Sequence, residues 1–165
     1  MLGGLRKLGA YLVGKRSELE DLELKDAVLA KTILDIHRKK SGKETVMVPL
    51  FALHPVHAID RPSAEAATAK RAAVLREHRP ELLELGQLTQ VELARFLPSV
   101  SWIKVVCEAE ERYISFEGNG RIAALQAVFC QNDKMQIEVE EYVFARPAKI
   151  VRRLRRVQRM NGLQD

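Results

Sequence analysis

The stretch from Glu111 to Phe129, ERYISFEGNGRIAALQAVF, constrains the fold more than any other part of the chain. Residues 113–116 alternate as the side chains of a strand do, and the segment IAALQAVF has the apolar spacing and alanine content of a helix. Between the two segments, Gly118, Asn119 and Gly120 are followed at once by Arg121. The sequence therefore predicts a strand, a glycine-rich corner and a helix with an arginine in its first turn.

This corner has the residue types of an anion-binding site. The first backbone N–H groups of a helix lack intrahelical partners, and together with the helix dipole they attract anions such as phosphate. Gly118 and Gly120 permit positive φ and close approach of a ligand, and Asn119 tolerates left-handed geometry. Arg121 can add a bidentate contact to phosphate or carboxylate. A purely structural turn, with Arg121 paired to Glu117, is the alternative interpretation.

Composition sets wider bounds. A chain of 165 residues is about the size of a single domain, and no apolar run approaches the roughly 20 residues that span a bilayer. The net charge of +5 permits an anionic partner without requiring one. Cys107 and Cys130 form no CxxC or Cys/His cluster, so we expect two packing residues, no metal site and a reducing, cytoplasmic location.

Residues 1–43 are expected to form a helical extension. A first helix would carry a stripe of Leu2, Leu5, Leu8 and Leu12. A second helix, capped by Ser17 and running through Lys40, would bury one face made of Leu22, Leu29, Ile33 and Ile36. The first 17 residues are basic and contain no acid, which is also typical of an organelle-targeting segment. An organelle is therefore the alternative location.

Residues 44–145 are expected to form an α+β core. Its predicted elements are a strand at 45–53, a helix opened by Pro62–Ser63, a short helix at Pro80, a helix with a capping box of Thr89 and Glu92, a hairpin made from WIKVV and RYISF, and a strand in MQIEVEEYVF. We expect Trp102 to lie in the core and the segment EAEER to be a solvated hairpin tip.

Residues 146–165 are expected to form a basic helix, with Pro147 in its first turn and Gly162 past its end. Ile150, Leu154 and Val157 recur at helical spacing and would dock the helix. The other faces would offer a polyanion, either nucleic acid or an acidic protein, the side chains of Lys149, Arg152, Arg153, Arg155, Arg156 and Arg159. The alternative is a solvated face neutralised by the acids of EVEEY.

Three segments resemble a known superfamily in their order and spacing. Val48–Pro49–Leu50, Trp102–Ile103–Lys104 and the stretch YISFEGNGRIAA resemble the ParB/sulfiredoxin superfamily, and sulfiredoxin in particular. The resemblance implies a ParB/sulfiredoxin-like fold, a small mixed sheet with flanking helices. Sulfiredoxin's catalytic cysteine would fall on Asn119, and a carboxamide cannot act as a thiolate nucleophile. We therefore do not expect sulfinic acid reduction.

The resemblance also implies a ligand. In ParB proteins the equivalent corner helps to bind a nucleoside triphosphate, so the implied cofactor is ATP or another nucleotide with Mg²⁺. Sulfiredoxin's phosphate-binding lysine would fall near Ser63 or Ala64, with Lys70 and Arg71 about two turns later. A superfamily loop that faces the corner would include His57. The implied ligand-binding residues are Glu117, Gly118, Asn119, Gly120, Arg121 and His57.

Three functional hypotheses follow. The first is a nucleotide- or phosphate-binding domain with a regulatory or nucleic-acid-associated role. The second is a small kinase or nucleotide hydrolase, because free-serine kinases of the superfamily carry an acid where Glu117 stands. That acid would bind Mg²⁺ or act as a base. The third is a degenerate scaffold that binds a protein partner, and no catalytic residue is assigned.

Overall fold

The computed structural model describes residues 24–163, and this part of the chain is an α+β structure, as expected. The predicted leucine stripe at residues 2–12, the Ser17 cap, Leu22 and the possible targeting segment lie outside the described residues. Within residues 24–163, no helix is both long and apolar enough to cross a membrane.

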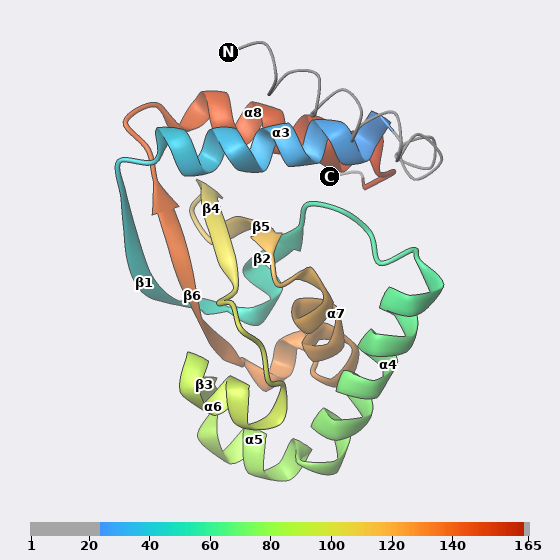
Figure 1. Ribbon diagram of the computed structural model, residues 1–165. Helices are drawn as coiled ribbons and strands as arrows, with labels where there is room; N and C mark the ends of the chain where they lie inside the picture. The colour runs from blue at the N-terminus through green and yellow to red at the C-terminus, as the bar shows by residue number, and fades with distance from the viewer. Residues whose placement is uncertain (1–23, 164–165) are drawn as a thin grey trace, which may run out of the picture.

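A mixed sheet forms the centre of the molecule (Figure 1). Its strand order is β1 (Gly42–Pro49), β6 (Gln136–Val143), β4 (Lys104–Ala109), β5 (Arg112–Glu117) and β2 (Leu53–Pro55), and β3 (Gln87–Leu88) pairs with β6. β4 and β5 pair antiparallel and form the predicted hairpin, whereas β2 pairs parallel with β5. The glycine corner follows β5, in the inner part of the sheet.

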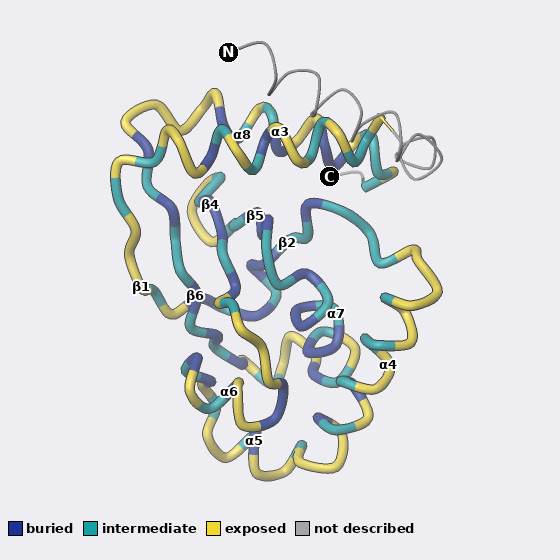
Figure 2. Tube along the Cα trace, in the orientation of Figure 1, coloured by how far each residue is buried: buried dark blue, intermediate teal, exposed yellow. Residues whose placement is uncertain are grey.

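Four helices cover one face of the sheet: α4 (Pro62–Glu77), α5 (Arg79–Leu85), α6 (Gln90–Phe96) and α7 (Asn119–Val128). They share a hydrophobic cluster with sheet residues such as Val105 and Val139. Thr89 caps α6 and Glu92 completes the capping box, as predicted. The continuous buried stretches of Figure 2 run through the central strands and α7.

The opposite face is covered by α3 (Leu24–Lys39) and α8 (Pro147–Met160), which lie side by side in Figure 1. Val106 belongs to this second cluster, whereas its strand neighbour Val105 belongs to the first, because successive strand side chains point to opposite faces. The predicted docking stripe is confirmed: the three residues Ile150, Leu154 and Val157 are buried. The predicted face of α3 is confirmed at Leu29, Ile33 and Ile36, which pack in the same cluster.

The predicted strand at 45–53 is instead divided. β1 ends at Pro49, a 3-10 turn occupies Leu50–Ala52, and β2 begins at Leu53. β1 and β2 are the two outer strands of the sheet order, so the chain must cross between them. The apolar residues Leu50 and Ala52 are buried within this crossing rather than within a strand.

Two burial predictions are wrong, and a third is wrong at Glu108. The side chain of Trp102 is 40% exposed, since Trp102 precedes β4 and the buried residue at this point is Ile103. Cys130 is also exposed, whereas Cys107 is half-buried. The predicted solvated hairpin tip is exposed at residues 109–111, but the side chain of Glu108 is only 1% exposed, because Arg112 and Arg155 both form ion pairs with it.

Candidate anion-binding site

The glycine corner joins β5 to α7, and its two glycines differ in backbone conformation. Gly118 is the N-cap of α7 and has φ 91°, in the left-handed region. Asn119 and Gly120 are already helical, so the expectation of positive φ at Gly120 is wrong. No side chain caps the helix, and the N–H groups of Asn119 and Gly120 have no acceptor within it.

Arg121 lies in the first turn of α7, and only 6% of its surface is exposed. Its guanidinium turns back toward the corner: a Cβ built on Gly118 would lie 3.1 Å from Arg121 Nη2 and 2.8 Å from Ile103 Cγ1. Burial lowers the pKa of Arg121, and the nearby charge of Arg71 lowers it further. An arginine nevertheless stays protonated in proteins, so this is a desolvated positive charge.

Arg71 reaches the same site from α4. A Cβ built on Gly120 would lie 2.9 Å from Arg71 Nη1 and 3.6 Å from Thr68 Oγ1, so glycine allows α4 to approach α7 closely. Neither Arg71 nor Arg121 forms a hydrogen bond or an ion pair through its side chain with another residue of the described range 24–163. Two like charges thus converge without an ion-pair partner in this part of the chain, and the only opposing effect on the pKa of Arg121 is the more distant charge of Glu117, which raises it.

Two buried oxygen atoms at the site also lack partners. Asn119 is only 5% exposed, and its Oδ1 has no hydrogen-bond donor among the described residues. Thr68 Oγ1 is buried in the same unsatisfied state. An unsatisfied buried polar group costs about 1–3 kcal/mol, so each atom favours a ligand that completes its hydrogen bonding.

Glu117 pairs with Lys104, whereas the structural-turn interpretation requires it to pair with Arg121. Lys104 Nζ donates to Glu117 Oε2 at 2.7 Å, so Glu117 does not pair with Arg121. Burial alone would raise the pKa of Glu117, but hydrogen bonds from Lys104 and Ser101 outweigh this effect and lower the pKa. The carboxylate is therefore held ionised and is a weak base.

These groups surround a cavity of about 330 Å³. His57, predicted to face the corner, lines the cavity, and its Nδ1 lies 3.0 Å from the carbonyl oxygen of Ala58. The full lining is His57, Arg71, Ser99, Ser101, Phe116, Glu117, Gly118, Asn119, Gly120 and Arg121. All six predicted ligand-binding residues are thus brought together.

The predicted set omitted Arg71, Thr68, Ser99 and Ser101, which the fold brings to the corner from two other segments. One signal was present in the sequence: α4 is rich in alanine, which permits close packing of its backbone against another helix. The alanine pattern does not predict that α7 is the helix that packs against α4.

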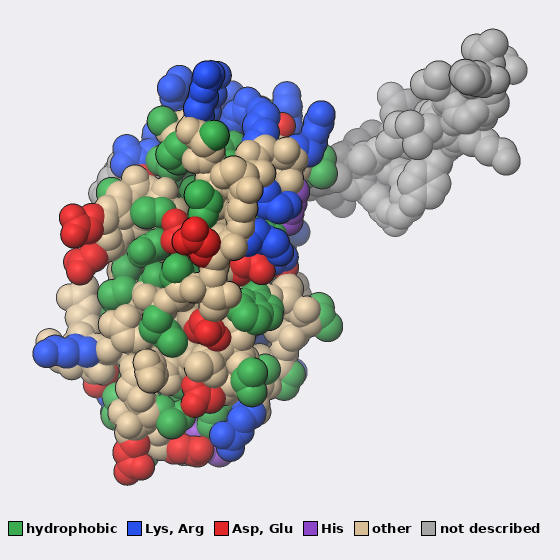
Figure 3. All heavy atoms as spheres, turned by 90° about the vertical axis from the view of Figure 1, so that its left-hand side faces the viewer, with side chains coloured by type: hydrophobic (Ala, Val, Ile, Leu, Met, Phe, Trp, Pro, Cys, Tyr) green, Lys and Arg blue, Asp and Glu red, His purple; other side chains and the backbone are tan. Residues whose placement is uncertain are grey.

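The basic residues of α8 divide into paired and unpaired groups. Arg153 forms an ion pair with Asp35 of α3, and Arg155 with Glu108 of β4. The neutralising acids are thus not those of EVEEY, where Glu140 pairs with Lys43. No ion pair within residues 24–163 involves Lys149, Arg152, Arg156 or Arg159, which are exposed. Figure 3 shows lysine and arginine side chains gathered at the end of the molecule where α3 and α8 lie.

No protein-family model, curated protein or solved structure matches this chain. The resemblance to the ParB/sulfiredoxin superfamily therefore stays a prediction, and functional argument depends on the geometry of the corner and of α8.

Proposed function

We propose that this chain is a ParB/sulfiredoxin-type domain that binds a nucleotide through its phosphates at the Gly118–Arg121 corner, in a regulatory or nucleic-acid-associated role. The observation that carries the proposal is the convergence of Arg71 and Arg121, which form no ion pair with the described residues. Bringing a half-buried guanidinium group beside a buried one is unfavourable unless an anion lies between them. A phosphate has the charge and the acceptor oxygens for both groups.

The unsatisfied oxygens favour a ligand that carries hydrogen-bond donors as well as phosphate oxygens. Phosphate oxygens would accept hydrogen bonds from the arginines and from the N–H groups of Asn119 and Gly120. Asn119 Oδ1 is an acceptor and needs a hydrogen-bond donor from the ligand, and Thr68 Oγ1 can also accept a hydrogen bond from such a donor. Ribose hydroxyl or base amino groups would supply such donors, so a nucleotide matches both sides of the site.

The geometry favours binding over turnover. A kinase or hydrolase would need Glu117 as a base or as a magnesium ligand, but Lys104 holds this carboxylate and its pKa is lowered. Among the described residues, no group of three or more His, Cys, Asp or Glu side chains is placed to hold a metal ion. In this proposal the phosphate oxygens of the nucleotide, and no side chain of the described residues, would hold Mg²⁺.

A thermal-shift screen of ATP, ADP, CTP and GTP, with and without Mg²⁺, tests the proposal. A ligand at 100 times its dissociation constant should stabilise the protein by about 2.7 kcal/mol. For the best nucleotide, Arg121→Ala and Arg71→Ala should each weaken binding roughly ten- to a hundredfold, the cost of a lost charge-assisted hydrogen bond. Arg76→Ala is the matched control, because Arg76 is exposed on α4 and does not line the cavity.

Two results would contradict the proposal. If both arginine variants stay folded and bind the nucleotide as tightly as the wild type, the ligand does not occupy this corner. If none of the four nucleotides stabilises the protein, the domain is better explained as a scaffold that binds a protein partner.

A second proposal concerns α8, and it rests on the exposed, unpaired basic residues described above. We propose that Lys149 and Arg156, with the partly neutralised Arg153, form a polyanion-binding stripe along the helix. Their spacing of three to four residues places them on one side of α8, and the docked apolar stripe leaves that side at the surface. Arginine suits phosphate oxygens because its planar fork binds two of them at once.

A further inference from the structure

Two neighbouring strands of the sheet separate along their length. β4 and β6 pair in parallel only at Lys104–Glu140 and Val105–Glu141. Beyond this point β6 continues to pair with β1 as far as Val143, and β4 with β5 as far as Ala109. Within residues 24–163, the facing edges of β4 and β6 therefore have no strand partner there, and such edges are templates for pairing with another chain.

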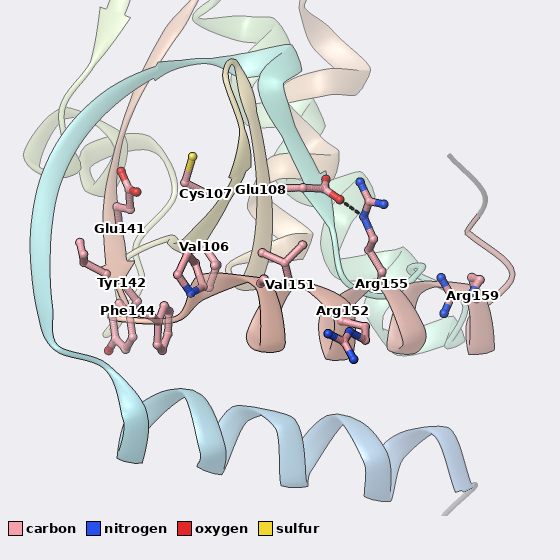
Figure 4. Close-up of a pocket in the computed structure, with 13 residues that line it drawn as sticks. Val106, Cys107, Glu108, Glu141, Tyr142, Phe144, Val151, Arg152, Arg155 and Arg159 are labelled. Atoms are coloured by element: carbon pink, nitrogen blue, oxygen red, sulfur yellow. Dashed lines mark hydrogen bonds and ion pairs between the residues drawn. The ribbon is translucent and has the colours of Figure 1, made fainter.

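A cavity of about 700 Å³ occupies this separation (Figure 4), and we call it the β4–β6 slot. Its apolar lining includes Val106, Phe144 and Val151, the last from α8, which closes one side of the slot. Cys107 and Glu141 line it from the two strands, with their side chains pointing away from α8. Ligand sites commonly have this size and a largely apolar lining.

The α8 side of the slot is positively charged. Arg152, Arg155 and Arg159 line it at spacings of three and four residues, so they share one face of the helix, which borders the row of Lys149 and Arg156. Arg155 is neutralised by Glu108, as the dashed line in Figure 4 marks. Arg152 and Arg159 form no ion pair with any residue of the described chain, so this side retains net positive charge.

We propose that the β4–β6 slot binds an extended, acidic and aliphatic segment of a partner protein. The segment would hydrogen-bond through its main chain to the open edge of β4 or β6. Its apolar side chains would contact Val106, Phe144 and Val151, and its acidic side chains would pair with Arg152 and Arg159. Strand addition to an open edge is a common form of peptide recognition, in which pockets for alternate side chains provide specificity.

Charge excludes residues 1–17 of the chain as the matching segment, but not residues 18–23, ELEDLE, which carry four acids and two leucines. Residues 1–17 contain no acid and carry four basic residues, so they have the same sign of charge as Arg152 and Arg159. A nucleic acid would match the charge but would leave the apolar lining without a partner. An acidic segment with aliphatic side chains satisfies both the charge and the lining.

The test uses a fluorescein-labelled peptide of about nine residues, rich in valine and glutamate, because strands are usually three to ten residues long. Its control is the same peptide with every glutamate replaced by lysine. We expect the acidic peptide to bind the full chain and the lysine peptide to bind at least tenfold more weakly in fluorescence anisotropy. The double variant Arg152→Glu/Arg159→Glu should weaken the acidic peptide about tenfold or more and strengthen the lysine peptide. Arg76→Glu/Arg95→Glu, the same change of charge at exposed positions of α4 and α6 that do not line the slot, should alter neither affinity by more than about twofold.

Cys107 provides a direct measure of occupancy. In a Cys130→Ser background, Cys107 is the only thiol, and bound acidic peptide should slow its alkylation severalfold in proportion to the fraction bound. Circular dichroism establishes that each variant is folded. The proposal is overturned if neither peptide binds, if both bind equally well, if Arg76→Glu/Arg95→Glu weakens binding as much as Arg152→Glu/Arg159→Glu, or if bound peptide leaves Cys107 as reactive as before.

Discussion

Gly118 and Gly120 lie two positions apart, yet the structure uses the absence of a side chain differently at each. At Gly118 the backbone is left-handed, and the neighbour of a built Cβ is the packed side chain of Ile103. At Gly120 the backbone is helical, and the nearest atom is the end of the flexible Arg71 side chain. Gly118 is therefore required for the backbone conformation of the corner, and Gly120 leaves the space that the Arg71 side chain occupies.

Replacing each glycine by alanine should separate these two roles. Gly118→Ala should destabilise the protein by at least about 1–3 kcal/mol, the usual cost of a strained backbone, plus the contact with Ile103. Gly120→Ala should keep or slightly raise stability, because alanine is about 1 kcal/mol better than glycine in a helix, but it should displace Arg71 and weaken nucleotide binding. Urea unfolding and nucleotide titration of both variants provide the comparison. Wild-type affinity in Gly120→Ala would show that Arg71 does not contact the ligand.

At the scale of elements, α8 docks on the rest of the molecule through one face and exposes basic side chains on its other faces. Its buried stripe attaches it to α3 and the sheet, and Gln158 Nε2 donates to the carbonyl oxygen of Pro55 at 2.9 Å. Its exposed sides carry the basic residues, of which Arg155 and Arg153 are held by acids of β4 and α3. A firmly docked helix is needed if those charges are to stay at defined positions.

Leu154→Ala tests this docking, because Leu154 is fully buried at the centre of the stripe. Truncating a buried leucine typically costs about 2–5 kcal/mol, through lost transfer free energy and the cavity left behind. The exposed Arg156→Ala, two positions along the same helix, should change stability by no more than about 0.5 kcal/mol. Urea midpoints with unchanged m-values would measure both effects. Equal stability of the two variants would mean that α8 does not pack as described.

At the scale of the whole molecule, the sheet separates two surfaces. The nucleotide proposed for the corner would bind near α4 and α7, whereas the unpaired charges of α8 lie on the opposite face. The net charge of +5 is therefore less informative than its distribution. Binding to the two surfaces should respond to different substitutions.

Duplex DNA titrated at several salt concentrations should show this separation. Affinity should fall with salt, and Lys149→Ala/Arg156→Ala should flatten the logarithmic slope by about two units, since each phosphate contact contributes about 0.9. Arg76→Ala/Arg95→Ala removes equal charge from exposed positions of α4 and α6 and should leave the slope near that of the wild type. Equal slopes for the two double variants, or no binding at low salt, would contradict a polyanion stripe on α8.

Short-range patterns in the sequence were sufficient for several elements. The strand, glycine corner and helix around Gly118, the capping box of Thr89 and Glu92, and the docking stripe centred on Leu154 were all predicted correctly. Each depends on residues within a few positions of one another, where periodicity and capping act. The α+β class follows from the same local signals.

Tertiary structure alone decided which distant residues meet. Arg71 lies near Arg121 only because α4 packs on α7. Lys104 forms an ion pair with Glu117 only because β4 pairs with β5. Trp102 is exposed, although it is apolar, because its neighbour Ile103 turns to the buried side. The β4–β6 slot depends on where the pairing of two strands stops. Local sequence fixes backbone preferences over a few residues, whereas these contacts depend on how elements tens of residues apart share one core.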